Sequence, residues 1–176
     1  MRRVVIADAG PLIGLARIGQ LSLLSQLFGI VSVTAWVADE VLAGGDSPDH
    51  AALQNAFTHS WLQTVTAPNA NDTAWQAQCQ ALIHLHQIDM GEASALVLAQ
   101  QLAAQGDAAL LLIDDFRGRQ AAQHSNVAAM GTAGVLLLAK QSGAVAAVKP
   151  LLIALRREGY FLSDRLMENV RLQAGE

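Results

Sequence analysis

Short runs of consecutive apolar residues alternate along this chain with longer segments of helical periodicity. The first run, residues 4–7, lies between charged residues, which is typical of a strand buried on both faces of a parallel sheet. We expect four further strands, over residues 30–33, 61–65, 109–113 and 127–130. Strands that alternate with helices predict an α/β fold in which helices cover both faces of a parallel sheet.

Turn and capping residues set the expected helix boundaries. Pro11 opens a helix at a position where its missing N–H costs nothing, and Gly29 ends the next helix. Residues 68–72 are expected to form a loop. We expect helices over residues 11–18, 21–28, 35–42, 48–57, 73–88, 90–104, 117–123, 132–143, 145–157 and 163–172.

The size and composition of the chain favour one soluble domain. At 176 residues it is most simply a single domain over residues 1–176, with C-terminal helices 145–173 as an extension. Although 52% of the residues are hydrophobic, the longest clean apolar run, residues 134–139, is far shorter than the roughly 20 residues of a membrane-spanning helix. The N-terminus opens with Arg2-Arg3 and has no signal-peptide cleavage site. We therefore expect a cytoplasmic protein with no membrane partner.

The net charge of −4 argues against indiscriminate nucleic-acid binding, because such binding depends on Lys and Arg to neutralise phosphates. It does not exclude an enzyme that acts on nucleic acid, since a cluster of acids that awaits cations makes the metal-free charge too negative. Pairs of basic residues at Arg117/Arg119 and Arg156/Arg157 could still bind phosphates locally.

Acidic residues follow two of the expected strands. Asp8 ends the first strand, and Asp114-Asp115 end the fourth. In an open doubly wound sheet, ligands gather at the carboxyl ends of the strands where the strand order reverses, and neighbouring strands there are roughly 5 Å apart. Carboxylates at such a short separation repel each other unless protons or metal ions lie between them. Their hard oxygen ligands suit Mg²⁺ or Mn²⁺. With Glu92, these acids predict a divalent-metal site.

Each acid also has a structural explanation. Glu92 lies in the first turn of its helix, where an acid stabilises the N-terminus by roughly 0.3–1 kcal/mol. Asp8 and the Asp114-Asp115 pair could serve as turn or cap residues. Glu40 lies late in its helix, where an acid is unfavourable to the helix dipole, although a solvated helix face accounts for it as well. The coincidence of several acids at one rim of the sheet favours a functional role.

Four segments in this order resemble the PIN-domain nucleases. The segments cover residues 6–16, 37–41, 90–96 and 112–119, and the resemblance continues through residues 131–137 to the C-terminal helices. The pattern is most similar to the VapC-like branch, whose members are often toxins in toxin–antitoxin operons. The resemblance implies a three-layer fold around five parallel strands in the order 3-2-1-4-5.

The resemblance also implies a metal-dependent endoribonuclease. In such nucleases, acids around one or two Mg²⁺ or Mn²⁺ ions activate water for hydrolysis of phosphodiester bonds, usually of RNA. Carried over residue by residue, the acids are Asp8, Glu40, Glu92 and then Asp114 or Asp115. Many members place Ser, Thr or Asn two residues after the first acid, where this chain has Gly10.

The expected partners are the RNA substrate, a small antitoxin protein and a second copy of the chain. Arg117 and Arg119 directly follow the acid pair and are candidates to bind substrate phosphate, although solvated residues on a helix surface would explain them too. An apolar face on the C-terminal helices suits a partner surface and equally suits the core. Its residues are Val148, Leu151, Leu152 and Leu155.

Two other functions stay open at this stage. A receiver domain also places acids at strand ends, but it requires a lysine after the last strand, and Lys140 and Lys149 lie well beyond residues 127–130. The second is a catalytically weak or inactive binding module that has kept the fold and acts through protein or nucleic-acid partners.

Overall fold

A computed structural model describes residues 3–43, 45, 47–65 and 72–176 of the chain. Arg2, Gly44 and all but the last residue of the expected loop over residues 68–72 lie outside the described residues. The sheet is entirely parallel, in the order β3-β2-β1-β4-β5, which confirms the predicted α/β class and strand order. The strands are β1 (Arg3–Ala7), β2 (Val31–Val33), β3 (Leu62–Thr64), β4 (Ala108–Leu112) and β5 (Ala128–Met130).

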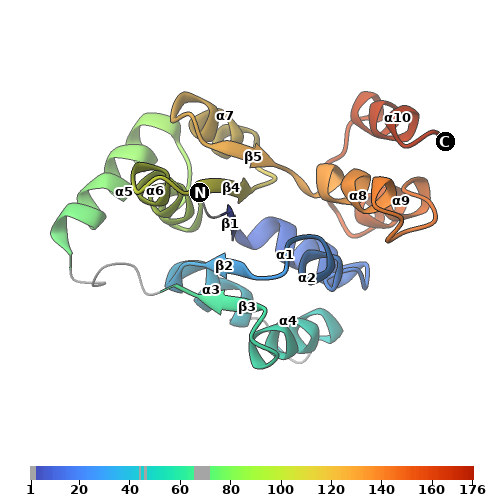
Figure 1. Cartoon of the computed structure of the whole chain (residues 1–176), viewed down its shortest axis with the longest axis horizontal. Helices are drawn as coiled ribbons and strands as arrows, with labels where there is room; N and C mark the ends of the chain where they lie inside the picture. The colour runs from blue at the N-terminus through green and yellow to red at the C-terminus, as the bar shows by residue number, and fades with distance from the viewer. Residues whose placement is uncertain (1–2, 44, 46, 66–71) are drawn as a thin grey trace.

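Helices surround the sheet (Figure 1). In Figure 1, α5 and α6 lie to one side of the sheet, and α1, α2, α8 and α9 lie to the other. Among the described residues, no helix has the length and apolar character needed to cross a membrane. The helices are α1 (Ala9–Arg17), α2 (Leu23–Phe28), α3 (Ala35–Leu42), α4 (Pro48–Thr58), α5 (Thr73–His86), α6 (Met90–Ala104), α7 (Phe116–His124), α8 (Thr132–Gln141), α9 (Lys149–Arg157) and α10 (Asp164–Gln173).

The central strands are buried on both faces toward their carboxyl ends, as the apolar run over residues 4–7 predicts, whereas the edge strands β3 and β5 keep exposed residues. In β4 and the residue after it, Leu112 packs into one hydrophobic cluster, while Leu111 and Ile113 pack into the other. All three are at most 1% exposed, and full burial of such a side chain contributes about 1.5–3 kcal/mol. The two clusters hold helices against opposite faces of the sheet, which gives the three-layer arrangement.

The apolar face of α9 belongs to the core. Val148, Leu152 and Leu155 are at most 1% exposed, and the half-buried Leu151 packs against the same cluster. This face is therefore already covered by the chain itself and does not present a partner surface.

The register of the two central strands brings their carboxyl ends together. Ala7 lies opposite Leu112, and the Asp8 N–H donates to the carbonyl oxygen of Leu112 at 2.9 Å. On the other side of β4, the Ile113 N–H donates to the Met130 carbonyl at 3.0 Å. The residues that follow β1, β4 and β5 therefore meet at one edge of the sheet, as expected for parallel strands.

Candidate active site

Asp8 joins β1 to α1 and lies at the centre of the site. Its Oδ2 accepts the Gly10 N–H at 3.5 Å, so that Asp8 is the N-cap of α1. The side chain is only 8% exposed. Burial raises the pKa of Asp8 to about 7; the backbone N–H groups of Ala9 and Gly10 lower it in part, and the charges of Asp89 and Glu40 raise it further.

Three carboxylates converge on Gly91, the second residue of α6. A Cβ placed on Gly91 would lie 3.2 Å from Glu40 Oε2, 3.3 Å from Asp89 Oδ1 and 3.5 Å from Asp8 Oδ1. The shortest of these distances is tighter than an ordinary carbon–oxygen contact. Because Gly91 has no side chain, oxygens from three separate segments surround one point.

Asp114 approaches Asp8 from the other side, over Gly10. A Cβ placed on Gly10 would lie 3.8 Å from Oδ2 of Asp8 and 3.8 Å from Oδ2 of Asp114. Asp8 therefore has Oδ1 near the Gly91 group and Oδ2 on the side of Gly10, where Asp114 Oδ2 also lies. It is the carboxylate that the two groups of acids share.

The two members of the acid pair after β4 have different surroundings. Asp114 Oδ1 accepts the Thr132 N–H at 2.7 Å, and its Oδ2 accepts the Thr132 hydroxyl at 2.5 Å. Asp115 is instead the N-cap of α7, where its Oδ1 accepts the N–H groups of Arg117 and Gly118 at 2.7 and 3.0 Å. Of the pair, Asp114 is the residue that lies beside Asp8.

Glu92 begins α6 as part of a capping box. Its Oε2 accepts the Asp89 N–H at 3.0 Å, and its own N–H donates to Asp89 Oδ1 at 2.8 Å. Burial raises the pKa of Glu92 to about 7, although the Asp89 N–H lowers it, and the charges of Asp89, Asp8 and Asp115 raise it further. Its Oε1 lies 3.3 Å from the position that a Cβ on Gly118 would occupy. Glu92 therefore caps α6 and also lies close to the other acids of the site.

Asp89 belongs to the site, although the sequence analysis did not single it out. It lies within the Gly91 group, and its charge raises the pKa of Glu40, after the larger effect of lost solvation. The available signal was the Asp-x-x-Glu spacing to Glu92, which indicates a capping box and so suggests only a structural role.

The two arginines after the acid pair are placed differently. Arg119 Nη1 donates to the Asp114 carbonyl oxygen, and its side chain lines a cleft beside the acids. Arg117 is exposed, and its Nη1 donates to the Gln87 carbonyl at 3.4 Å. Of the two arginines predicted to bind phosphate, the structure brings Arg119 into the site and leaves Arg117 on the surface of α7.

Tyr160 connects the C-terminal segment to the loop that carries Asp8. Its hydroxyl donates to the Gly10 carbonyl at 2.8 Å. Its ring lies over Gly14, where an added Cβ would come within 2.8 Å of Cζ. Burial raises the pKa of Tyr160 to about 12, with a further contribution from Asp114. The sequence analysis gave no reason to expect this contact.

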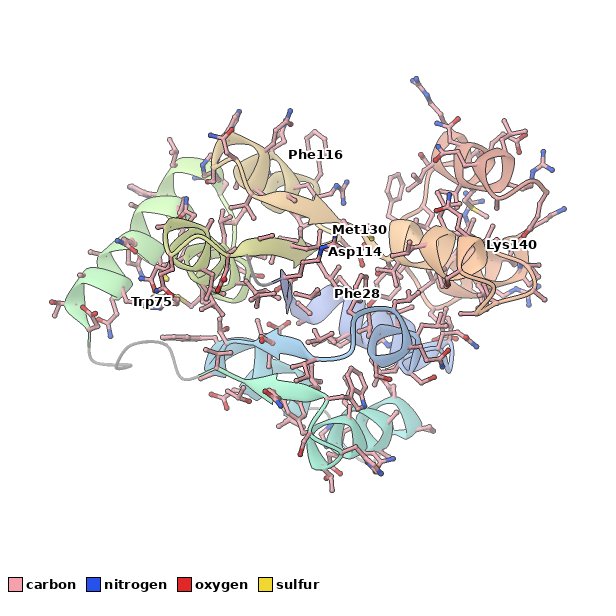
Figure 2. All side chains as sticks on the ribbon, in the orientation of Figure 1. Phe28, Trp75, Asp114, Phe116, Met130 and Lys140 are labelled. Atoms are coloured by element: carbon pink, nitrogen blue, oxygen red, sulfur yellow. The ribbon has the colours of Figure 1, made fainter. Side chains whose placement is uncertain are left out.

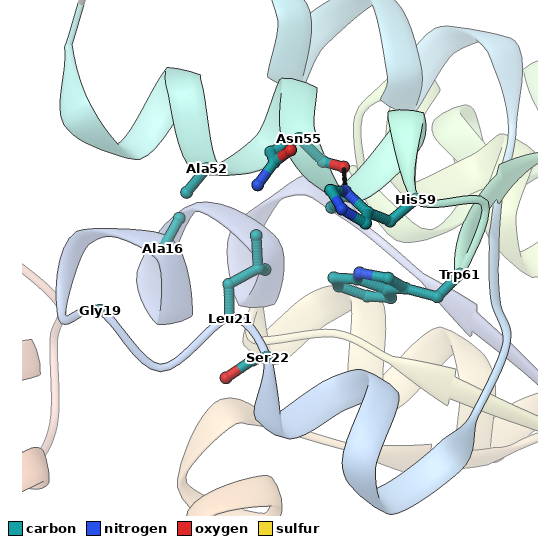
Figure 3. Close-up of a pocket in the computed structure, with 9 residues that line it drawn as sticks. Ala16, Gly19, Leu21, Ser22, Ala52, Asn55, His59 and Trp61 are labelled. Atoms are coloured by element: carbon teal, nitrogen blue, oxygen red, sulfur yellow. Dashed lines mark hydrogen bonds between the residues drawn. The ribbon is translucent and has the colours of Figure 1, made fainter.

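Two of the hollows on the molecule lie on different parts of it. A cleft of about 640 Å³ adjoins the acids and is lined by Asp114, Asp115, Arg119 and Thr132, among others. A second pocket, of about 370 Å³, lies between α4 and the α1–α2 segment, with Trp61 and His59 on its wall (Figure 3). No described residue that lines the second pocket is acidic or carries a Lys or Arg charge, so we take the first cleft as the substrate side.

The carboxylates suit a hard divalent cation in their chemistry. Within the described part of the chain, no group of three or more His, Cys, Asp or Glu side chains is arranged to hold a metal ion. The donors around Gly91 are nevertheless all carboxylate oxygens, the ligands that Mg²⁺ and Mn²⁺ prefer. A cation would also relieve the desolvation and repulsion that raise the pKa of Asp8 and of Glu92. Asp8 could hold such an ion together with the acids of either group.

The comparison with known proteins agrees with this architecture. A family model described as a PIN domain matches residues 4–176, and no curated protein matches the chain. PIN domains are generally nucleases, which act on nucleic acid and typically use divalent metal ions. The match spans nearly the whole chain, and the observed strand order is the one that the resemblance implied. This chain is therefore a member of the PIN-domain family.

Proposed function

We propose that this protein is a Mg²⁺- or Mn²⁺-dependent endoribonuclease that hydrolyses phosphodiester bonds of RNA. The observation that carries the proposal is the convergence of acids from three other segments on Asp8. Glu40 comes from α3, Asp89 from the start of α6 and Asp114 from the end of β4. Carboxylates gathered in this way are unfavourable without a counter-ion, which supports a cation-dependent reaction.

The residues of the chain have separate roles in this proposal. Asp8, with Glu40 and Asp89 on one side and Asp114 on the other, holds the cation, and Thr132 fixes the Asp114 carboxylate through two hydrogen bonds. When bound, the ion supplies activation of water and neutralisation of charge on the phosphate.

Glu92 and Arg119 have roles in proton transfer and in substrate binding. Water attacks phosphorus, the bond from phosphorus to the leaving oxygen breaks, and the leaving oxygen gains a proton. Glu92 has a pKa of about 7 and one oxygen, Oε1, outside the capping box, which suits it to accept the proton of the attacking water. Arg119, which lines the cleft beside Asp114, is placed to bind a substrate phosphate.

We further propose that the protein is a VapC-like toxin that a small antitoxin holds inactive. The sequence resemblance supports this assignment, and membership of the PIN family is consistent with it. Expression of the chain alone should arrest growth, and coexpression of the neighbouring gene should relieve the arrest. Normal growth during expression of active enzyme contradicts the toxin role and leaves the nuclease activity untouched.

Asp8→Asn is the decisive variant for the nuclease proposal. Asparagine is also a good N-cap, so the fold should survive, but the charge that the two acid groups share is lost. We expect cleavage of single-stranded RNA by the wild type with Mn²⁺ or Mg²⁺, and a loss of at least about a hundredfold in Asp8→Asn or with EDTA. Cleavage that persists in both controls removes this mechanism.

Neighbouring acids on α3 provide a matched control. Glu40 and the adjacent Asp39 are both exposed, but Glu40 Oε2 approaches Gly91, whereas Asp39 takes part in none of these contacts. Glu40→Gln should reduce cleavage at least about tenfold, while Asp39→Asn should retain wild-type rates. Equal effects of the two substitutions would mean that general charge, and not the site, controls activity.

One observation favours the alternative of a weak or inactive binding module. Many PIN nucleases carry a hydroxyl or amide side chain where this chain has Gly10. The site has room for one, because a Cβ on Gly10 would make only contacts of 3.7–3.8 Å. We expect Gly10→Ser to fold normally and to cleave RNA at least as fast as the wild type. An inactive wild type that Gly10→Ser converts into a nuclease would establish the binding-module alternative.

A further inference from the structure

The cleft beside the acids has two chemically different walls. One wall consists of the acid pair, Arg119 and the start of α8. The other comes from the end of α9 and the connection to α10, with Leu155, Leu166 and the segment over residues 160–163. Asp114 belongs both to the cleft and to the acid site, so the two are continuous.

Exposed aromatic rings gather at this cleft. Phe161 is 94% exposed and Phe116 is 62% exposed, and both line the cleft although they are far apart in sequence. In Figure 2, Phe116 projects from α7 on the side that faces the C-terminal helices, above Asp114. Such exposure leaves the faces of the rings open to water, where they are available to stack on another planar group.

The tryptophans do not provide an equivalent surface. Trp75 is 1% exposed, and Trp36 and Trp61 are half-buried and pack against the hydrophobic clusters. The three tryptophans therefore pack into the core. Among the described residues, the exposed aromatic side chains Phe116 and Phe161 therefore concentrate where the proposed substrate enters.

Positive charge lies in the same cleft. The Arg119 side chain lines it together with the acid pair and the two phenylalanines. A planar base beside a phosphate needs an aromatic face and a nearby cation, which is how proteins bind single-stranded nucleic acid. A duplex would not offer an unstacked base to these rings.

We propose that this cleft is a nucleobase subsite, in which Phe161 and Phe116 stack on the base of a single-stranded nucleotide next to the scissile phosphate. The inference rests on the proposed nuclease function and specifies its substrate as unpaired RNA. The base occupies the part of the cleft that the two rings line, and Arg119 binds the phosphate that joins this nucleotide to the one beside the acids. A partner protein on the two rings is the competing occupant, and the test separates the two.

The experiment measures fluorescence anisotropy of a labelled single-stranded oligoribonucleotide with the full chain in EDTA, which prevents cleavage. We expect Phe161→Ala and Phe116→Ala each to raise Kd at least about fivefold, as for the loss of one base–aromatic stack. Phe161→Trp should bind as tightly as the wild type. Leu85→Ala and Leu172→Ala are the controls, because these side chains are 74% and 61% exposed, line none of this cleft and should leave Kd unchanged.

An abasic scan of the oligonucleotide identifies the stacked base. One abasic position should weaken binding to the wild type by a factor similar to Phe161→Ala, and it should weaken binding to Phe161→Ala no further. In cleavage assays with Mn²⁺, the phenylalanine variants should raise KM and leave kcat within about twofold, because the acids are intact.

The outcomes distinguish this inference from the nuclease proposal. If the wild type is active and both alanine variants have unchanged Kd and KM, the subsite is overturned and the nuclease proposal is retained. If the same variants also fail to bind the antitoxin, the antitoxin is the occupant of the cleft. Binding that depends on Phe161 without cleavage by the wild type supports the subsite and contradicts the nuclease. A wild type that neither binds nor cleaves RNA overturns both.

Discussion

At the level of single residues, Asp8 combines a structural and a chemical role. As the N-cap it starts α1 at Ala9, two residues before the position that Pro11 predicts. Its carboxylate is nevertheless buried, close to other acids, and has a pKa of about 7. A cap alone could use a neutral Asn or Ser, so the buried acid is consistent with a role in holding a cation.

This pKa makes the stability of the metal-free protein depend on pH. The folded state holds a proton on Asp8 up to about pH 7, whereas the unfolded chain loses it near 3.8. Between about pH 4 and 7 the folded state therefore binds more protons, and the free energy of unfolding falls as pH rises.

Asp8→Asn should remove much of this pH dependence. In EDTA at pH 8 we expect the variant to be more stable than the wild type by about 1–3 kcal/mol, and the difference should shrink toward pH 4. Urea unfolding across this pH range measures the effect. A variant that is less stable than the wild type at pH 8 would show that the charged Asp8 carboxylate does not destabilise the metal-free fold.

The sequence predicted the acids at strand ends better than the contacts around them. Asp8 and the Asp114-Asp115 pair could be placed because parallel strands bring their carboxyl ends to one edge, and the register does so, but only the structure distinguishes Asp114 from Asp115. Asp89 could not be recognised, because its spacing to Glu92 indicates a helix cap and nothing more. Tyr160 lies 150 residues from Gly10, and only tertiary packing brings them together.

At the level of elements, packing between α1 and the C-terminal segment holds the site in place. The Tyr160 hydroxyl binds the Gly10 carbonyl in the first turn of α1, and Gly14 makes room for the ring in the next turn. The C-terminal extension therefore contributes directly to the position of the Asp8 loop. The expected division into a core domain and an extension stays a prediction.

Two alanine substitutions in α1 test this packing against each other. Alanine normally stabilises a helix by up to about 1 kcal/mol relative to glycine. At Gly14 the new Cβ would lie 2.8 Å from Tyr160 Cζ, so Gly14→Ala should lower the free energy of unfolding by about 1–3 kcal/mol. At Gly10 the contacts are ordinary, so Gly10→Ala should be neutral or stabilising. Equal stability of both variants would contradict the packing.

Some observed element boundaries differ from the predicted ones, because helix-capping and strand-pairing preferences outweighed the apolar pattern. The helix expected over residues 145–157 begins at Lys149, because Pro150 suits the first turn of a helix and lacks the N–H that an earlier start would require. Residues 108–112 form β4 one position earlier than expected, because the strand pairs fully with β1. The order and type of the elements followed from the alternation of apolar runs with helices.

At the level of the whole molecule, the net charge of −4 is informative about the site. A chain with 15 acidic residues brings several of them to one edge of one sheet, although dispersal over the surface would lower their repulsion. Cations at this edge would reduce both the local repulsion and the net negative charge that a phosphate must approach. This reconciles an acidic protein with a nucleic-acid substrate.

The most direct test of the account is isothermal titration of the metal-free full chain with Mn²⁺ near pH 7. Because Asp8 and Glu92 have pKa values of about 7, binding should release protons, seen as heats that vary with the ionisation enthalpy of the buffer. We predict that the wild type binds Mn²⁺ with proton release and that Asp8→Asn loses this binding. Absence of binding to the wild type, or unchanged binding to Asp8→Asn, would contradict a cation site built around Asp8.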